Sequence, residues 1–245
     1  MSEVFPVGQV ALMSLFQFRG LDRFWAMRQM AVLPPRLRVY PGLQFFKVLG
    51  TGAGLGYSSI PNFNQWGLLT VWPSVEAALD FFGNSEVMDQ YRLKTSEHFS
   101  VLLRPIKSRG QWSGNPAFET QPLLSEDYPL AVLTRARLKL RFIIPFWRRV
   151  GGVSRSQKDY SGQLFSQGLG ERPWIHQATF SIWQSQEAME QFAFGKESRH
   201  LEAIKITRQK NGFKEELYAR FQVIGHQGTI IGRNPLAQIK TPSLL

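Results

Sequence analysis

The sequence lacks cysteine altogether, since none occurs among its 245 residues. This absence excludes disulfide bonds, thiolate nucleophiles, cysteine-held zinc, iron–sulfur clusters and a haem iron bound by cysteine. Histidine is scarce, with four residues, and no two of them have the i,i+4 spacing of a helical zinc site. The Gly-x-Ser-x-Gly turn of many hydrolases is also missing. Disulfide scaffolds, cysteine-dependent enzymes and common hydrolases are therefore disfavoured.

Long hydrophobic runs are missing as well. Residues 4–18 carry no charge, but this run is shorter than the roughly 20 residues that a membrane-spanning helix needs. Residues 48–75 are also free of charge, yet glycine, asparagine and proline interrupt them. No basic start followed by a small-residue cleavage site precedes the first run. We therefore expect a cytoplasmic protein, with a peripheral contact at the inner membrane surface left open.

Acidic residues are few compared with basic ones, at 18 against 29, which gives a net charge of +11. Such a surface favours polyanionic partners, namely nucleic acid, anionic lipid or an acidic protein. The basic residues are spread in short groups along the chain, without the concentrated face interleaved with aromatic side chains that nucleic-acid binding requires. With 43% hydrophobic and 13% aromatic residues, the chain is expected to fold around a large core.

An internal repeat organises the chain. Residues 71–81 line up with residues 182–192 at an offset of 111, and this match includes Trp72 over Trp183. Two weaker matches occur in the same order, residues 24–25 over 146–147 and residues 110–114 over 228–232. Three ordered matches predict a duplication in which elements persist while loops differ.

Each half is predicted to be an α+β, ferredoxin-like β-α-β-β-α-β unit. The expected strands are 10–18, 43–49, 67–72 and 99–103, then 130–140, 164–169, 178–183 and 218–224; the expected helices are 23–32 and 75–82, then 142–150 and stretches within 186–210. Residues 1–118 form the first half, 128–232 the second half with the cofactor ligand, and 233–245 a tail. The two sheets are expected to cover each other in an internal α+β barrel. Two separate domains joined by residues 119–127 are the alternative.

The glycine-rich run at residues 50–56 lacks the Gly-x-Gly-x-x-Gly spacing, and no helix is expected to follow it. We interpret it as a loop leaving the second strand. Among the histidines, His200 lies in a helical pattern with Ile204 on its face. It is expected to face an apolar space between the two sheets, where an imidazole can bind a haem iron. His176 opens the strand that leads to Trp183, and His226 is expected in a turn.

The segment from Trp183 to His200 resembles the dimeric α+β-barrel monooxygenases, including the haem-degrading ones. In those enzymes a helical histidine after a similar Trp/Ser/Glu-Ala stretch holds the iron. The resemblance implies that His200 is the metal ligand and that Ile204 and Trp183 line the cofactor. Asp89 stands at the equivalent position of the first half, which implies one haem b per chain.

A closer resemblance extends over nearly the whole chain. Four runs are similar to the spheroidene monooxygenase family of bacterial carotenoid ketolases: FKVLGTGAGLGY at 46–57, RGQWSG at 109–114, WIHQATFSIW at 174–183 and EELYARF at 215–221. The resemblance implies a haem-dependent monooxygenase that uses O2 and an acidic, ferredoxin-type electron donor. It also implies a hydrophobic small-molecule substrate, a carotenoid that is hydroxylated and then converted to a ketone.

Candidates for the oxygen-binding side of the haem are His176, Gln177, Arg109 and Trp112. His176 also remains an alternative to His200 as the iron ligand. Two other functions stay open: a haem-degrading or other small-molecule monooxygenase of the same barrel type, and a non-catalytic ligand-binding barrel.

Overall fold

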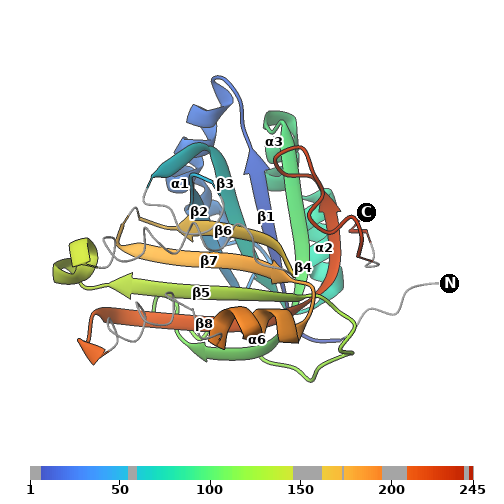
Figure 1. The fold of residues 1–245 in the computed structure, drawn as a ribbon. Helices are drawn as coiled ribbons and strands as arrows, with labels where there is room; N and C mark the ends of the chain where they lie inside the picture. Colours follow the sequence, from blue (N-terminus) through green and yellow to red (C-terminus); the bar gives the residue numbers. More distant parts are fainter. Residues whose placement is uncertain are drawn as a thin grey trace.

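A computed structural model describes residues 7–54, 60–145, 162–172, 174–194, 209–239 and 243–244. Its described strands form one closed antiparallel barrel in the order β1-β3-β2-β6-β7-β5-β8-β4 (Figure 1). The strands are β1 (Val10–Gln17), β2 (Phe45–Gly52), β3 (Pro61–Trp72), β4 (Glu97–Gly110), β5 (Leu130–Leu138), β6 (Gln163–Gly170), β7 (His176–Trp183) and β8 (Phe213–Gly228). The helices are α1 (Asp22–Arg38), α2 (Val75–Asn84), α3 (Glu86–Lys94), the short 3-10 helix η1 (Leu140–Phe142) and α6 (Gln186–Phe194).

The first four strands lie in the order β4-β1-β3-β2 and the last four in the order β8-β5-β7-β6. Two seams join these groups. The β4–β8 seam runs from Phe99 opposite Gly228 to Gly110 opposite Leu217. The β2–β6 seam has two pairs, Gly50 with Gly170 and Thr51 with Leu169. Strands from both halves therefore share one hydrogen-bonded barrel, as the barrel prediction requires.

The strands are buried on both faces, as β1 illustrates. Ala11, Met13 and Leu15 point into the barrel, while Val10 and Leu12 point outward against the helices. Large side chains such as those of Phe99, Phe180 and Phe221 fill the barrel interior. The space between the sheets that we expected beside His200 is thus packed core in the part of the chain that the structure describes.

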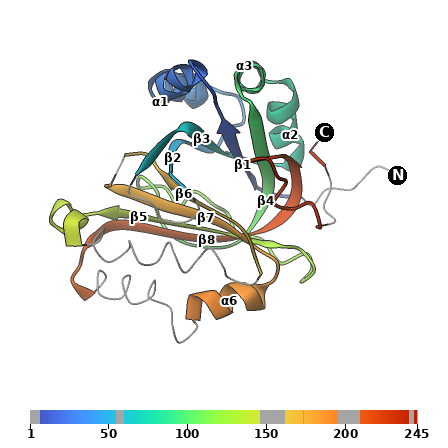
Figure 2. The ribbon, with the colours of Figure 1, turned by 45° about the horizontal axis from the view of Figure 1, so that its top comes forward.

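Helices cover the outside of the barrel. The first three lie over the outer face of the first four strands, and α6 lies on the opposite side, over the outer face of the second group (Figure 2). None of the described helices is both long and apolar enough to cross a membrane.

The repeated motif has the same contacts in both halves. Trp72 stacks on Phe81 with ring centroids 4.9 Å apart, and Trp183 stacks on Phe192 at 5.0 Å. Each indole Nε1 donates to a hydroxyl two residues earlier at 2.9 Å. A serine two residues after each tryptophan accepts a hydrogen bond of 3.3 Å from the first turn of the following helix, which is a typical N-cap. The offset read from the sequence thus aligns equivalent structural positions.

The helices differ from the prediction in two places. Helix α1 does not end before Pro34 but continues to Arg38, because buried Leu33 and Leu37 hold its last turns against the sheet despite the missing proline N–H groups. Helix α3 was not expected, although Ser85 caps it by accepting from Met88 N at 3.1 Å.

The glycine-rich run begins within β2 rather than in a loop, since Gly50, Thr51 and Gly52 pair with neighbouring strands. Likewise, His226 lies in β8 and not in a turn, and its Nε2 is 3.1 Å from Asn234 Nδ2.

Candidate functional site

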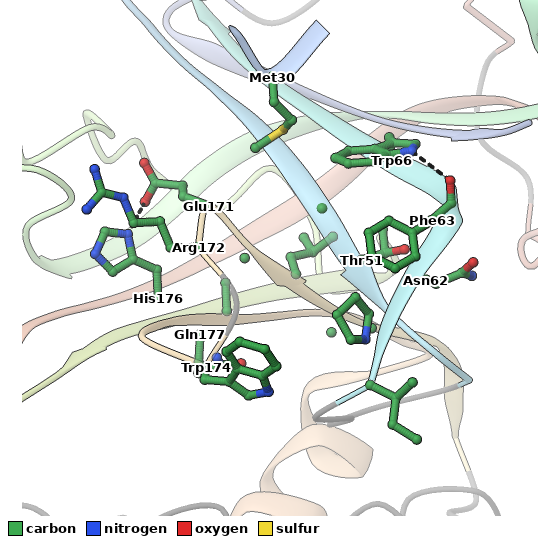
Figure 3. Close-up of a pocket in the computed structure, with 18 residues that line it drawn as sticks. Met30, Thr51, Asn62, Phe63, Trp66, Glu171, Arg172, Trp174, His176 and Gln177 are labelled. Atoms are coloured by element: carbon green, nitrogen blue, oxygen red, sulfur yellow. Dashed lines mark hydrogen bonds and ion pairs between the residues drawn. The ribbon is translucent and has the colours of Figure 1, made fainter. Parts of the chain in front are cut away.

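A pocket of about 230 Å³ opens on the outer face of the barrel at the β2–β6 seam (Figure 3). Its lining residues come from α1, β2, β3, β6, β7 and the segments beside them: Met30, Gly50, Thr51, Gly52, Ile60, Pro61, Asn62, Phe63, Trp66, Gly168, Leu169, Gly170, Glu171, Arg172, Trp174, His176, Gln177 and Ala178. Glu171, Arg172 and His176 gather at one end, and Trp66 and Phe63 at the other. The pocket therefore has a polar end and an apolar end.

Two of the predicted site residues, His176 and Gln177, line this pocket. Trp112 is buried directly after β4, close to the polar end. Arg109 is exposed in β4 and is not among the pocket residues. Trp183 lies at the far end of β7, against α6. His200 and Ile204 lie outside the described residues.

Glu171, which the sequence analysis did not single out, joins these elements. Its carboxylate accepts from Lys47 Nζ at 2.8 Å and from Trp112 Nε1 at 2.7 Å. Arg135 Nη2 lies 3.7 Å from the same carboxylate, and His176 Nδ1 lies 3.4 Å from it. Residues from β2, β5, β7 and the segment after β4 thus meet at one carboxylate, which we call the Glu171 cluster.

Glu215 extends the Glu171 cluster. Its carboxylate accepts from the buried Arg135 and from the backbone N–H groups of Ser113 and Gly114, at 3.1 and 2.8 Å. Lys47 Nζ also donates to Ser113 Oγ at 2.8 Å. Each of the four runs that carry the family resemblance therefore contributes to this cluster. The sequence gives no local signal for Glu171, because Arg135, Trp112 and Lys47 precede it by 36 to 124 residues, and only His176 lies nearby in the chain.

The electrostatics of the Glu171 cluster follow from its charges. Burial alone would raise the pKa of Glu171, but the hydrogen bonds from Lys47 and Trp112 and the nearby Arg135 charge lower it overall. The pKa of His176 is lowered, first by burial and then by neighbouring arginines, although the Glu171 charge opposes this. A neutral imidazole can bind a metal or accept a proton.

The outer faces of the two halves differ at equivalent positions. Val10 pairs with Trp72 as Leu130 pairs with Trp183, which sets the correspondence between strands. At equivalent positions the first half carries larger residues than the second. Phe46 corresponds to Ser166, Val48 to Gly168, Leu68 to Thr179 and Phe16 to Ala136. In the second half, the buried hydroxyls of Ser166 and Thr179 have no hydrogen-bond partner among the described residues.

The described residues contain no group of three or more acidic or histidine side chains placed to hold a metal ion. A cofactor iron held by one imidazole does not need such a group. The described residues thus offer a pocket lined by a neutral histidine and, outside that lining, two buried hydroxyls without described partners.

No family model matches the chain. Among solved structures, a crystal structure of aldoxime dehydratase is similar with a TM-score of 0.56 at 12% identity, covering 89% of this chain and 82% of that one. At this identity the likeness shows the fold alone, and it agrees with the α+β barrel.

The curated relatives are closer. Spheroidene monooxygenase of Cereibacter sphaeroides is 36% identical over 95% of this chain and 72% of that protein. The enzyme of Rhodobacter capsulatus is 36% identical over 93% of this chain and 95% of that protein, and the enzyme of Rubrivivax gelatinosus is 34% identical over 92% and 86%. The chain belongs to the spheroidene monooxygenase family.

Proposed function

We propose that this protein is a haem-dependent monooxygenase that oxidises a long apolar substrate, a carotenoid of the spheroidene type. Family membership carries this proposal, because relatives named for spheroidene oxidation match more than nine-tenths of the chain. The pocket, with its apolar end and its neutral histidine, supports it.

The smaller side chains on the outer face of the second half favour it as the place of a flat, largely apolar group. Small side chains at Ser166, Gly168 and Thr179 replace the large ones of the first half. Two buried hydroxyls there lack partners in the described ranges, and an unsatisfied buried polar group is costly unless something else satisfies it. A haem beside these hydroxyls would supply the missing polar partners.

His200 is the residue that would hold the iron. It follows the end of α6 by six residues, a length of at most about 20 Å, and α6 packs on the outer face of the second half. This favours the outer face over the barrel interior. Haem, when bound, supplies O2 activation and attack on an unreactive C–H bond.

The protein's own groups position the substrate and manage protons. His176 at the pocket is held neutral by burial and by the surrounding arginines, so it can accept a proton near neutral pH. His176 Nδ1 lies 3.4 Å from the Glu171 carboxylate, so a proton accepted by the imidazole would be stabilised by that charge. Phe63 and Trp66 line the apolar end of the pocket.

We also propose that the net charge of +11 serves to dock an acidic, ferredoxin-type electron donor. The same charge suits a peripheral contact with anionic lipid, from which an apolar substrate would be taken. The equal strand order of the two halves and their matching tryptophan motifs support an origin by tandem duplication.

The test is the absorbance spectrum of the purified protein supplied with haem. We expect a Soret band that is lost in His200→Ala and kept in His226→Ala, a matched control whose imidazole contacts Asn234. Loss in His176→Ala instead would make His176 the ligand, and a wild type without a Soret band would refute haem dependence. Bleaching of the band with O2 and a reductant alone would identify a haem-degrading enzyme.

A further inference from the structure

The floor of the pocket at the β2–β6 seam is made of backbone. Gly50 and Gly52 lie on the outer face of β2, and Gly168 and Gly170 on the outer face of β6. Gly50 pairs with Gly170 and Thr51 with Leu169, and the same antiparallel register continued by one residue would bring Gly52 opposite Gly168. The four glycines leave a patch without side chains on two adjacent strands, roughly 7 by 5 Å.

Steric crowding does not account for every one of these glycines, although β2 has a register irregularity between Gly50 and Thr51. A side chain at Gly170 would collide with the carbonyl oxygen of His176, at 2.5 Å from an added Cβ. At Gly50, by contrast, an added Cβ would make ordinary contacts of 3.6 Å with Gly170 O and 3.8 Å with Trp66. Glycine within a strand weakens it and often marks a place where a ligand comes close to the backbone. The bare surface at Gly50 therefore points to an occupant.

The walls of the pocket are apolar and open to solvent. Phe63 is 56% exposed, Ile60 67% and Trp174 51%, and Met30 lies across the pocket from Trp174 (Figure 3). Large hydrophobic side chains gathered around a hollow mark a ligand-binding groove rather than ordinary surface. The polar end, with Glu171 and His176, limits how far an apolar chain can extend in that direction.

From this arrangement we infer that the pocket at the β2–β6 seam binds the conjugated hydrocarbon chain of the substrate, laid flat on the four glycines and flanked by Phe63, Trp66 and Trp174. A conjugated polyene is planar and apolar, so it suits a floor without side chains between aromatic walls. This inference rests on the proposed function for the identity of the substrate, but it assigns the binding surface independently of where the haem lies.

The test uses the fluorescent tetraene parinaric acid as the probe and compares Gly50→Ala with Gly50→Val. Valine is favoured in strands, so Gly50→Val should keep or raise the melting temperature. It should weaken tetraene binding at least tenfold, with Gly50→Ala in between. Phe63→Ala should weaken binding as well, whereas Phe24→Ala, at a phenylalanine of α1 that is 52% exposed and outside the pocket, should not.

The Soret band of each variant separates this inference from the proposed function. Weaker tetraene binding with an unchanged Soret band supports the inference. If the wild type binds no haem, weaker tetraene binding in Gly50→Val still supports the inference, but the proposed haem dependence is refuted. Unchanged tetraene affinity in a stably folded Gly50→Val overturns it. Loss of the Soret band in Gly50→Val also overturns it, because the pocket would then hold the porphyrin.

Discussion

The outer faces of the two halves differ in how much apolar side-chain volume they carry at equivalent positions. In the first half, Phe46, Val48 and Leu68 pack against α1, α2 and α3 and form a continuous core. In the second half, the equivalent positions carry Ser166, Gly168 and Thr179. The first face thus stabilises the barrel through buried apolar volume, while the second gives up that volume. The comparison indicates that buried apolar volume is concentrated on the outer face of the first half.

The largest effect is expected from making the first face resemble the second. Leu68→Thr removes a buried side chain that is 2% exposed and introduces a hydroxyl among apolar groups. We expect the free energy of unfolding to fall by about 4 kcal/mol, measured by urea denaturation. A loss below about 1 kcal/mol would mean that the first face does not carry the stability assigned to it.

The Glu171 cluster, which connects the halves, should give the next largest effect. Glu171→Gln removes a charge that accepts from Lys47 and Trp112, and we expect a loss of about 2 kcal/mol at pH 7. Because the pKa of Glu171 is lowered by folding, its contribution is present above the ordinary value of 4.5 and is lost as the pH falls through the lowered pKa.

The difference between wild type and Glu171→Gln should therefore shrink on acidification below pH 4.5. Urea denaturation of both proteins between pH 7 and pH 3 measures this. A constant difference over that range would show that the charge of Glu171 is not what stabilises the cluster.

A smaller and opposite effect should come from the orphaned hydroxyl of the second face. Ser166→Val removes a buried oxygen without a described partner and should raise the free energy of unfolding of the haem-free protein by about 1 kcal/mol. It should also lower the haem content, read from the Soret band. The matched control is Ser14→Val, which should destabilise by about 1 kcal/mol because Ser14 is paired with Ser100 at 2.8 Å. Equal changes in the free energy of unfolding in both variants would show that the two outer faces do not differ in this respect.

The smallest effect is expected at Arg109. The side chain is exposed in β4 and does not line the pocket, so Arg109→Ala should change the free energy of unfolding by less than about 0.5 kcal/mol. Haem content should also remain unchanged. A loss of the Soret band in Arg109→Ala would restore the role that the sequence analysis assigned to this residue.

The barrel and its repeated tryptophan motif could be predicted from the sequence, because hydrophobic periodicity and an offset of 111 are local signals. The continuation of α1 through Pro34 could not, since tertiary packing of Leu33 and Leu37 outweighed a local helix-breaking signal. His176 and Trp112 were found by resemblance, but the carboxylate that joins them was not. Glu171 acquires its partners only when distant strands meet, and single-sequence patterns do not report such contacts. The iron ligand His200 stays a prediction.

The two seams of the barrel are unequal: eleven residue pairs join β4 to β8, whereas two join β2 to β6. Local opening costs least where the fewest hydrogen bonds must break. We therefore expect the amide hydrogens around Gly50 and Gly170 to exchange with solvent well before those of the β4–β8 seam, which extends from Phe99 to Leu217. A barrel with one long and one short seam can admit a large ligand by opening locally at the short seam while the rest of the molecule stays folded.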